Sequence, residues 1–195
     1  MPILDQTGTE IVHYTNFPDD DGVNNIEVGA GRNCFGKKYF NQCYLTDLST
    51  PNYPHFSQND NYDEINSHFL DEIVDFYNLT PVRTYNRIIF CNPVGFGFQG
   101  KENAKKILNK AGELLNLDGE ILVVGNSTNG WAKYDSATKW LGRLVQDGLL
   151  DYNFQISALS PLTENHIYRT DHMFWKMTVD EPTIVNQMFT ITKIA

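Results

Sequence analysis

The sequence predicts an α/β fold with a mostly parallel sheet, helices on both faces and an antiparallel edge near its C-terminal end. The first observation is that residues 86–91 and 120–124 are nearly continuous apolar runs, as in parallel strands covered on both faces. The second is a helical pattern over residues 102–115, which separates these runs and makes strand and helix alternate. The third is that strands are predicted over 152–159, 173–179 and 188–194 with no helical pattern between the last two, which favours an antiparallel return.

A strand–helix–strand unit is predicted at the start of this pattern. Residues 25–28 form a short strand, residues 33–40 a brief helix interrupted by Gly36, and residues 42–46 a second strand closed by Asp47. Two longer helices are predicted over residues 62–77 and 136–146 from their apolar spacing. A weak third strand is predicted over residues 81–84.

Composition and charge limit the class of protein. The chain has 195 residues, 41% of them hydrophobic and 20% charged, which is typical of a globular domain. The formal net charge of -9 repels phosphate backbones, so a long nucleic acid is an unlikely partner. The 3 cysteines include no C-x-x-C pair, and no apolar stretch is long enough for a signal or a membrane span. We therefore expect a cytoplasmic protein with no disulfide framework, no metal site and no membrane attachment.

The strongest local pattern is the glycine-containing turn after the first strand. The segment Asn25-Ile26-Glu27-Val28-Gly29-Ala30-Gly31 is followed by Asp47, which stands 20 residues after Glu27. Glycines at a strand-to-helix turn let a ligand approach the backbone closely. An acid at the tip of the next strand can accept hydrogen bonds from both hydroxyls of a ribose. This spacing predicts a nucleoside site, whereas the simpler alternative is a tight turn with a solvated Asp47.

These residues resemble the motifs of the class I S-adenosylmethionine-dependent methyltransferases, which have a Rossmann-like fold. The resemblance implies that Glu27, Gly29, Ala30 and Gly31 wrap the methionine part of S-adenosylmethionine, and that Asp47, followed by Leu48, binds its ribose. It covers roughly residues 20–130, and the glycine motif is partly degenerate because Asn33 replaces its third small residue. It also implies one domain over 1–195, with a lead-in or lid (1–22), a cofactor-binding core (23–130) and C-terminal strands (131–195).

Asn92-Pro93, at the end of the fourth predicted strand, is similar to the family motif that contacts both the cofactor and the acceptor. In enzymes that methylate planar amino groups, the Asn side chain and the next carbonyl accept hydrogen bonds from the target nitrogen. The resemblance therefore makes Asn92 and Pro93 the candidate catalytic residues and Asn92 a candidate cofactor contact. No acid follows the strand predicted over 81–84, where the family often holds the adenine amino group. Further candidate groups on the rim are His13, Tyr14, His55, Asn126 and Trp131.

The function expected from these motifs is methyl transfer from S-adenosylmethionine to a small molecule or a protein, with the acceptor and the oligomeric state left open. One alternative is a catalytically inactive methyltransferase fold that serves as a binding or toxin-associated interaction module. Another is a nicotinamide-dependent oxidoreductase. Glu27 argues against the latter, because a carboxylate just before the glycines repels a pyrophosphate at the helix N-terminus.

Overall fold

The computed structural model describes residues 24–30, 35–40, 43–48, 70–80, 83–93, 97–130, 134–170, 172–173 and 183–195. The predicted α/β architecture is confirmed, because most strands of one large sheet run parallel and the C-terminal ones run antiparallel. The parallel strands are β1 (Asn25–Val28), β2 (Cys43–Asp47), β3 (Glu72–Ile73), β4 (Tyr85–Cys91) and β5 (Leu115–Gly125). The C-terminal strands of the sheet are β6 (Phe154–Ile156), β7 (Ser160–Pro161) and β10 (Gln187–Lys193).

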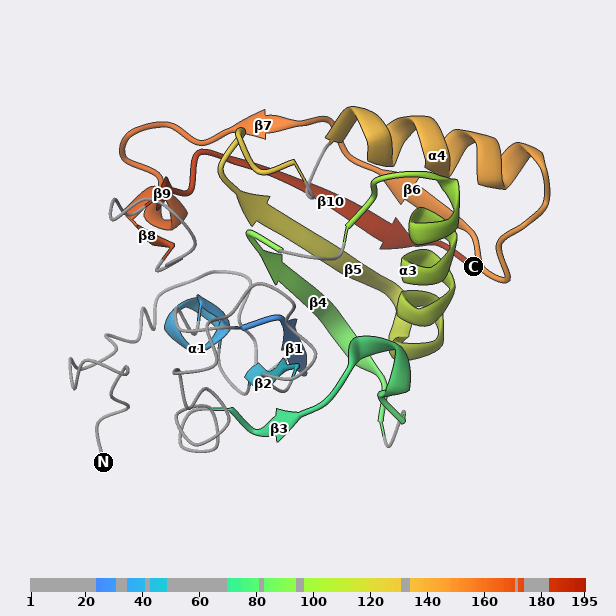
Figure 1. Ribbon diagram of the computed structural model, residues 1–195, viewed down its shortest axis with the longest axis horizontal. Coiled ribbons are helices and arrows are strands. Elements are labelled where there is room, and N and C mark those ends of the chain that lie inside the picture. Colours follow the sequence, from blue (N-terminus) through green and yellow to red (C-terminus); the bar gives the residue numbers. More distant parts are fainter. Residues whose placement is uncertain are drawn as a thin grey trace, which may run out of the picture.

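The strand order is β3-β2-β1-β4-β5-β10-β6, with β7 also paired to β10. In Figure 1, the arrows of β4 and β5 point the same way and β10 runs against them between β5 and β6. The predicted antiparallel edge is therefore confirmed. The carboxyl ends of β1, β2, β4 and β5 consequently share one edge of the sheet, which is where α/β proteins bind ligands.

Helices cover both faces of the sheet. One face carries α1 (Phe35–Tyr39), and the other carries α3 (Lys101–Leu114) and α4 (Tyr134–Gln146). Alternation along β4 explains the two layers, because Ile88 and Phe90 pack in the core with α3, whereas Ile89 packs in the core with α1. Among the described residues, no helix combines the length and apolar character needed to cross a membrane.

The connection after β7 leaves the sheet at its carboxyl edge and packs on α1. It contains a 3-10 turn, η3 (Ile167–Thr170), and the paired strands β8 (His172–Met173) and β9 (Thr183–Ile184). The Tyr168 ring lies 5.0 Å from that of Phe35 and 4.9 Å from that of Tyr39, and the Tyr39 hydroxyl donates to Ile167 O at 3.2 Å. The C-terminal part of the chain therefore braces the helix that follows the glycine turn.

The helix predicted over residues 62–77 is wrong for its described part, residues 70–77. Those residues form β3 and a 3-10 turn, η2 (Phe76–Asn78), while 62–69 lie outside the described residues. Pairing with β2 overrides the helical pattern, since Glu72 and Ile73 align with Thr46 and Asp47. Ile73, assigned to a buried helical face, is 37% exposed at the sheet edge.

Several other predicted elements differ from those in the structure. The strand predicted over 81–84 is wrong for Arg83 and Thr84, which lie in a bend and a connecting segment, and the third strand is β3 instead. Gly36 lies inside α1 and does not interrupt it. β5 begins before the apolar run at 120–124 and pairs irregularly with β4 there, where Asp118 has a φ of 61°. Of the strand predicted over 152–159, only β6 forms, and β7 begins just beyond that range at Ser160. Met173 belongs to β8, outside the large sheet.

Candidate functional site

The glycine turn at the end of β1 leaves exposed main chain at the carboxyl edge. Gly29 has a φ of 68°, a conformation that residues with a side chain rarely adopt, and a Cβ built there meets no atom of the described residues within 4 Å. Ala30 N then donates to Thr46 O at 3.0 Å, which ties the turn to β2. Gly31 lies outside the described residues. The turn therefore offers open space against bare backbone at Gly29, as close approach of a ligand requires.

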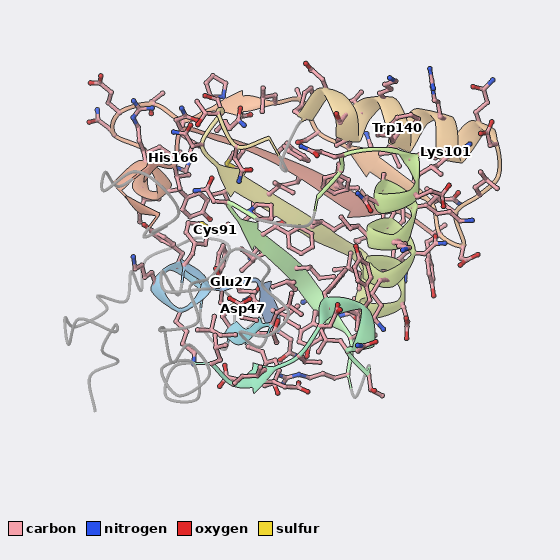
Figure 2. All side chains as sticks on the ribbon, viewed as in Figure 1. Glu27, Asp47, Cys91, Lys101, Trp140 and His166 are labelled. Carbon is pink, nitrogen blue, oxygen red and sulfur yellow. The ribbon has the colours of Figure 1, made fainter. Side chains whose placement is uncertain are left out.

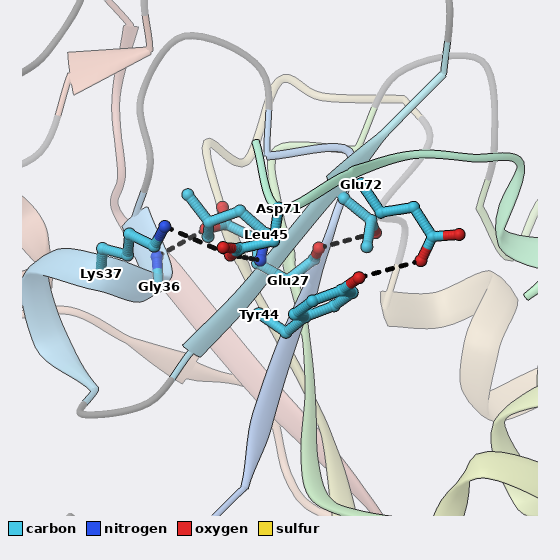
Figure 3. A network of polar contacts seen from close by, with 8 residues as sticks. Glu27, Gly36, Lys37, Tyr44, Leu45, Asp71 and Glu72 are labelled. Atoms are coloured by element: carbon cyan, nitrogen blue, oxygen red, sulfur yellow. Dashed lines mark hydrogen bonds and ion pairs between the residues drawn. The ribbon is translucent and has the colours of Figure 1, made fainter. Parts of the chain in front are cut away.

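Glu27 lies fully buried on β1 and holds the start of α1. Its Oε2 accepts a hydrogen bond of 2.6 Å from Gly36 N, the contact drawn in Figure 3. A carboxylate in this place is favourable because the first N–H groups of a helix lack partners within the helix and carry partial positive charge. The negative charge at the first turn of α1 is thus supplied by the protein itself.

Gly36 is required by the close approach of α1 to β1 and β2. A Cβ on Gly36 would lie well inside van der Waals distance of Cys43 Sγ and 2.9 Å from Glu27 Oε2. The neighbouring Lys37 forms an ion pair of 3.2 Å with Asp71, and Asp71 Oδ2 also accepts from Leu45 N at 2.8 Å. These contacts, seen together in Figure 3, join α1, β2 and the start of β3 into one polar network.

Asp47 lies at the carboxyl end of β2, beside the glycine turn. Val28 aligns with Thr46 in the parallel register, so the next residues, Gly29 and Asp47, leave neighbouring strands side by side. Asp47 is 2% exposed, and its Oδ1 accepts from Leu48 N at 2.7 Å. Figure 2 labels Glu27 and Asp47 on the neighbouring strands β1 and β2, and Asp47 comes two residues after Leu45, the partner of Glu27. The structure therefore brings together the two parts of the predicted nucleoside site.

An acid that sequence reasoning missed follows the true third strand. Asp75 comes two residues after β3, and its Oδ1 accepts from Tyr77 N at 2.9 Å, which caps η2. The expectation that no acid follows the third strand is wrong, because the third strand was predicted over residues 81–84 and is β3 instead. Asp75 is only partly buried, and the neighbouring Val74 N donates to Asp47 O at 2.7 Å. The acid thus stands one strand beyond Asp47 at the same edge.

Asn92 and Pro93 are held by the turn that follows β5. Asn92 is 3% exposed with a φ of 47°, and its Oδ1 accepts from Asn126 N at 2.7 Å. Pro93 O accepts from Asn129 Nδ2 at 3.1 Å. Both oxygens that the resemblance assigns to a target nitrogen therefore already accept a hydrogen bond from the protein. A Cβ on Gly125 would overlap Asn92 Oδ1, so this glycine makes room for the amide.

The remaining rim candidates separate into two groups. Asn126 lies in the turn against Asn92, whereas His13, Tyr14, His55 and Trp131 fall outside the described residues. His166, labelled apart from Glu27 and Asp47 in Figure 2, accepts a hydrogen bond of 3.2 Å from Tyr168 N through Nδ1, and burial lowers its pKa. Cys91 lies buried at the end of β4 and forms no disulfide within the described residues.

The thiol of Cys43 makes folding sensitive to alkaline pH. Burial, followed by the negative charge of Glu27, raises the pKa of Cys43 well above its usual value, so the folded state holds the neutral thiol. An unfolded cysteine loses its proton above about pH 8.5. The free energy of unfolding should therefore be unaffected by this group below that pH and fall by about 1.4 kcal/mol per pH unit above it, until the folded thiol ionises.

Urea unfolding at about pH 8, 9 and 10 measures how the free energy of unfolding changes with pH. The Cys43 thiol contributes to this change because it ionises in the unfolded state above its ordinary pKa. We expect the stability of Cys43→Ala to depend less steeply on pH than that of the wild type. Tyr77, whose pKa is raised to about 12 by burial, begins to contribute only at the upper end of this range. Parallel pH profiles for the two proteins would contradict the assignment.

Comparison with known proteins identifies the fold. No protein-family model matches the chain, and neither does any curated protein. Among solved structures, the N-methyltransferase NodS from Bradyrhizobium japonicum WM9 has a TM-score of 0.50 at 9% identity, over 89% of this chain and 86% of that one. A TehB-like SAM-dependent methyltransferase from Corynebacterium glutamicum has a TM-score of 0.48 at 13% identity, over 88% and 80%. The chain has the fold of class I methyltransferases, as its sequence predicts.

Proposed function

We propose that this protein binds S-adenosylmethionine at the carboxyl ends of β1 and β2 and transfers its methyl group to a small-molecule or protein acceptor. The observation that carries the proposal is the juxtaposition of an open glycine turn at Gly29 with the buried carboxylate of Asp47. A turn without a side chain admits a ligand against the backbone, and the acid beside it matches a ribose diol.

The residues present fit S-adenosylmethionine better than a dinucleotide. A dinucleotide places its pyrophosphate on the N–H groups at the start of the helix after the glycine turn. In this chain Glu27 Oε2 accepts from Gly36 N in the first turn of α1 and is buried there. A second anion would meet this carboxylate in a setting of low dielectric. The methionine part of S-adenosylmethionine has an ammonium group, which a nearby carboxylate favours.

Each residue of the site has one role in the proposal. Asp47, with Leu48 beside it, accepts hydrogen bonds from the ribose, and the main chain of Gly29, Ala30 and Gly31 lies along the methionine part. Asp75, one strand further, accepts from the adenine amino group, the role that the resemblance gives to an acid after the third strand. When bound, the cofactor supplies a methyl group already activated by the sulfonium, so the protein's main task is alignment of the acceptor.

Titration calorimetry of the full chain with S-adenosylmethionine, S-adenosylhomocysteine and NAD tests the proposal. We expect micromolar binding of the first two and no binding of NAD. Binding of NAD alone would favour an oxidoreductase, and binding of none would favour the inactive interaction module. Incubation of cell extract with the protein and methyl-labelled S-adenosylmethionine, followed by mass spectrometry, should then reveal the methylated product.

A further inference from the structure

We propose that the acceptor molecule presents a carbonyl or carboxylate oxygen, and not an amino group, to Asn92. The inference rests on the proposed function and specifies the chemistry of its acceptor. The orientation of the Asn92 side-chain amide is the observation behind it. Asn92 Oδ1 accepts a hydrogen bond of 2.7 Å from Asn126 N, and a main-chain N–H can only donate. The oxygen of this amide must therefore face Asn126, and the amino group Nδ2 must face the other way.

The turn that supplies this N–H is itself held in one arrangement. Asn126 Oδ1 accepts from Thr128 N at 2.9 Å and from Thr128 Oγ1 at 2.7 Å. Asn186, just before β10, accepts from Ser127 N at 2.8 Å and donates to Ser127 Oγ at 3.1 Å. Reversal of the Asn92 amide would direct two donors at each other within this network. The donor orientation of Nδ2 is thus set by the protein.

Nδ2 is left as a buried donor. Within the part of the chain that the structure describes, no group accepts a hydrogen bond from Asn92 Nδ2, although Asn92 is only 3% exposed. A buried donor without a partner is rare in folded proteins because it loses its hydrogen bonds to water. Such a group calls for an acceptor atom supplied by a ligand, and carbonyl and carboxylate oxygens only accept.

The position of Asn92 places this donor on the acceptor side of the proposed cofactor site. Glu27 aligns with Ile89 in the pairing of β1 with β4, so Asn92 leaves β4 beside the turn that follows β1. The same amide would discriminate against an amino group, because two donors would then face each other in a site with little water. Enzymes that read a substrate by a buried polar group reject the mismatched analogue strongly.

Side-chain NMR of the ¹⁵N-labelled full chain, saturated with S-adenosylhomocysteine, tests the inference. The probes are acetophenone and benzoate, which offer oxygen acceptors, and aniline and benzylamine, which offer amino donors. We expect the Asn92 Nδ2 signal to shift with the oxygen probes only, and these to bind about tenfold more tightly than their amino counterparts. Equal affinities, or an Nδ2 signal that responds to no probe, would overturn the inference.

Asn92→Asp is the matched variant. It keeps an oxygen toward Asn126 N, replaces only the amino group, and retains a residue type that tolerates positive φ. We expect loss of the preference for oxygen probes, measured at a concentration of S-adenosylhomocysteine that saturates the variant. A weakened affinity for S-adenosylhomocysteine with an unchanged probe preference would assign the donor to the cofactor and contradict the inference. Failure of the wild type to bind S-adenosylhomocysteine would instead refute the proposed function. The wild-type signal remains decisive if the variant does not fold.

Discussion

Gly36→Ala should destabilise the fold by about 3 kcal/mol, because an inserted methyl group in a packed core forces its surroundings apart. The new Cβ would overlap Cys43 Sγ and lie 2.9 Å from Glu27 Oε2. Since Gly36 N donates to that same carboxylate, the displacement also weakens the contact that holds α1 against β1. Urea unfolding followed by circular dichroism measures the loss.

Gly142→Ala is the matched control for this substitution. Gly142 also lies inside a helix, α4, but it is exposed and a Cβ there meets no atom within 4 Å. Alanine favours helix over glycine by about 1 kcal/mol, so this variant should be slightly more stable than the wild type. A second test is the double variant Gly36→Ala/Cys43→Ala, which removes the sulfur and should recover part of the lost stability. Equal effects at positions 36 and 142 would show that the close approach of α1 is unimportant.

Asp47→Ala should weaken binding of S-adenosylhomocysteine by about 1 to 3 kcal/mol, roughly 5- to 150-fold, through loss of charge-assisted hydrogen bonds to the ribose. The carboxylate lies buried beside the glycine turn, where the proposal places the ribose. Titration calorimetry provides the measurement, and Asp47→Asn separates the contribution of the charge from that of side-chain volume.

Glu72→Gln serves as the control for general charge. Glu72 stands one strand away and is exposed, and its carboxylate accepts from the Tyr44 hydroxyl at 3.1 Å. Glu72→Gln changes the net charge of the protein by the same amount as Asp47→Asn. We nevertheless expect the affinity for S-adenosylhomocysteine to stay at the wild-type value in Glu72→Gln. If Asp47→Ala retained wild-type affinity, the ribose would have to lie elsewhere.

The core of the site could be predicted from sequence because parallel strands end at a common edge. The apolar runs located β4 and the second half of β5, and the spacing between Glu27 and Asp47 placed Asp47 at the tip of the strand after β1. Fully buried strands carry a strong apolar signal that flanking turns delimit well. These features depend on short segments, so local pattern was sufficient.

Features that depend on distant partners could not be predicted in this way. β3 is a two-residue edge strand with a partly exposed Ile73, which leaves too little pattern to recognise, and Asp75 was missed with it. In the sequence alone, Gly36 resembles a helix breaker. The structure shows that Gly36 is constrained by close contact with Cys43 on the next strand, which local pattern does not reveal. The direction of the Asn92 amide is set by a main-chain N–H 34 residues away, at Asn126.

A crystal structure of the full chain with S-adenosylhomocysteine would test the proposed cofactor site most directly. We expect ribose hydroxyls within hydrogen-bonding distance of the Asp47 carboxylate and the homocysteine part against the backbone at Gly29, with Glu27 still accepting a hydrogen bond from Gly36. A ligand bound away from this turn, or a turn filled by a side chain of the protein, would contradict it.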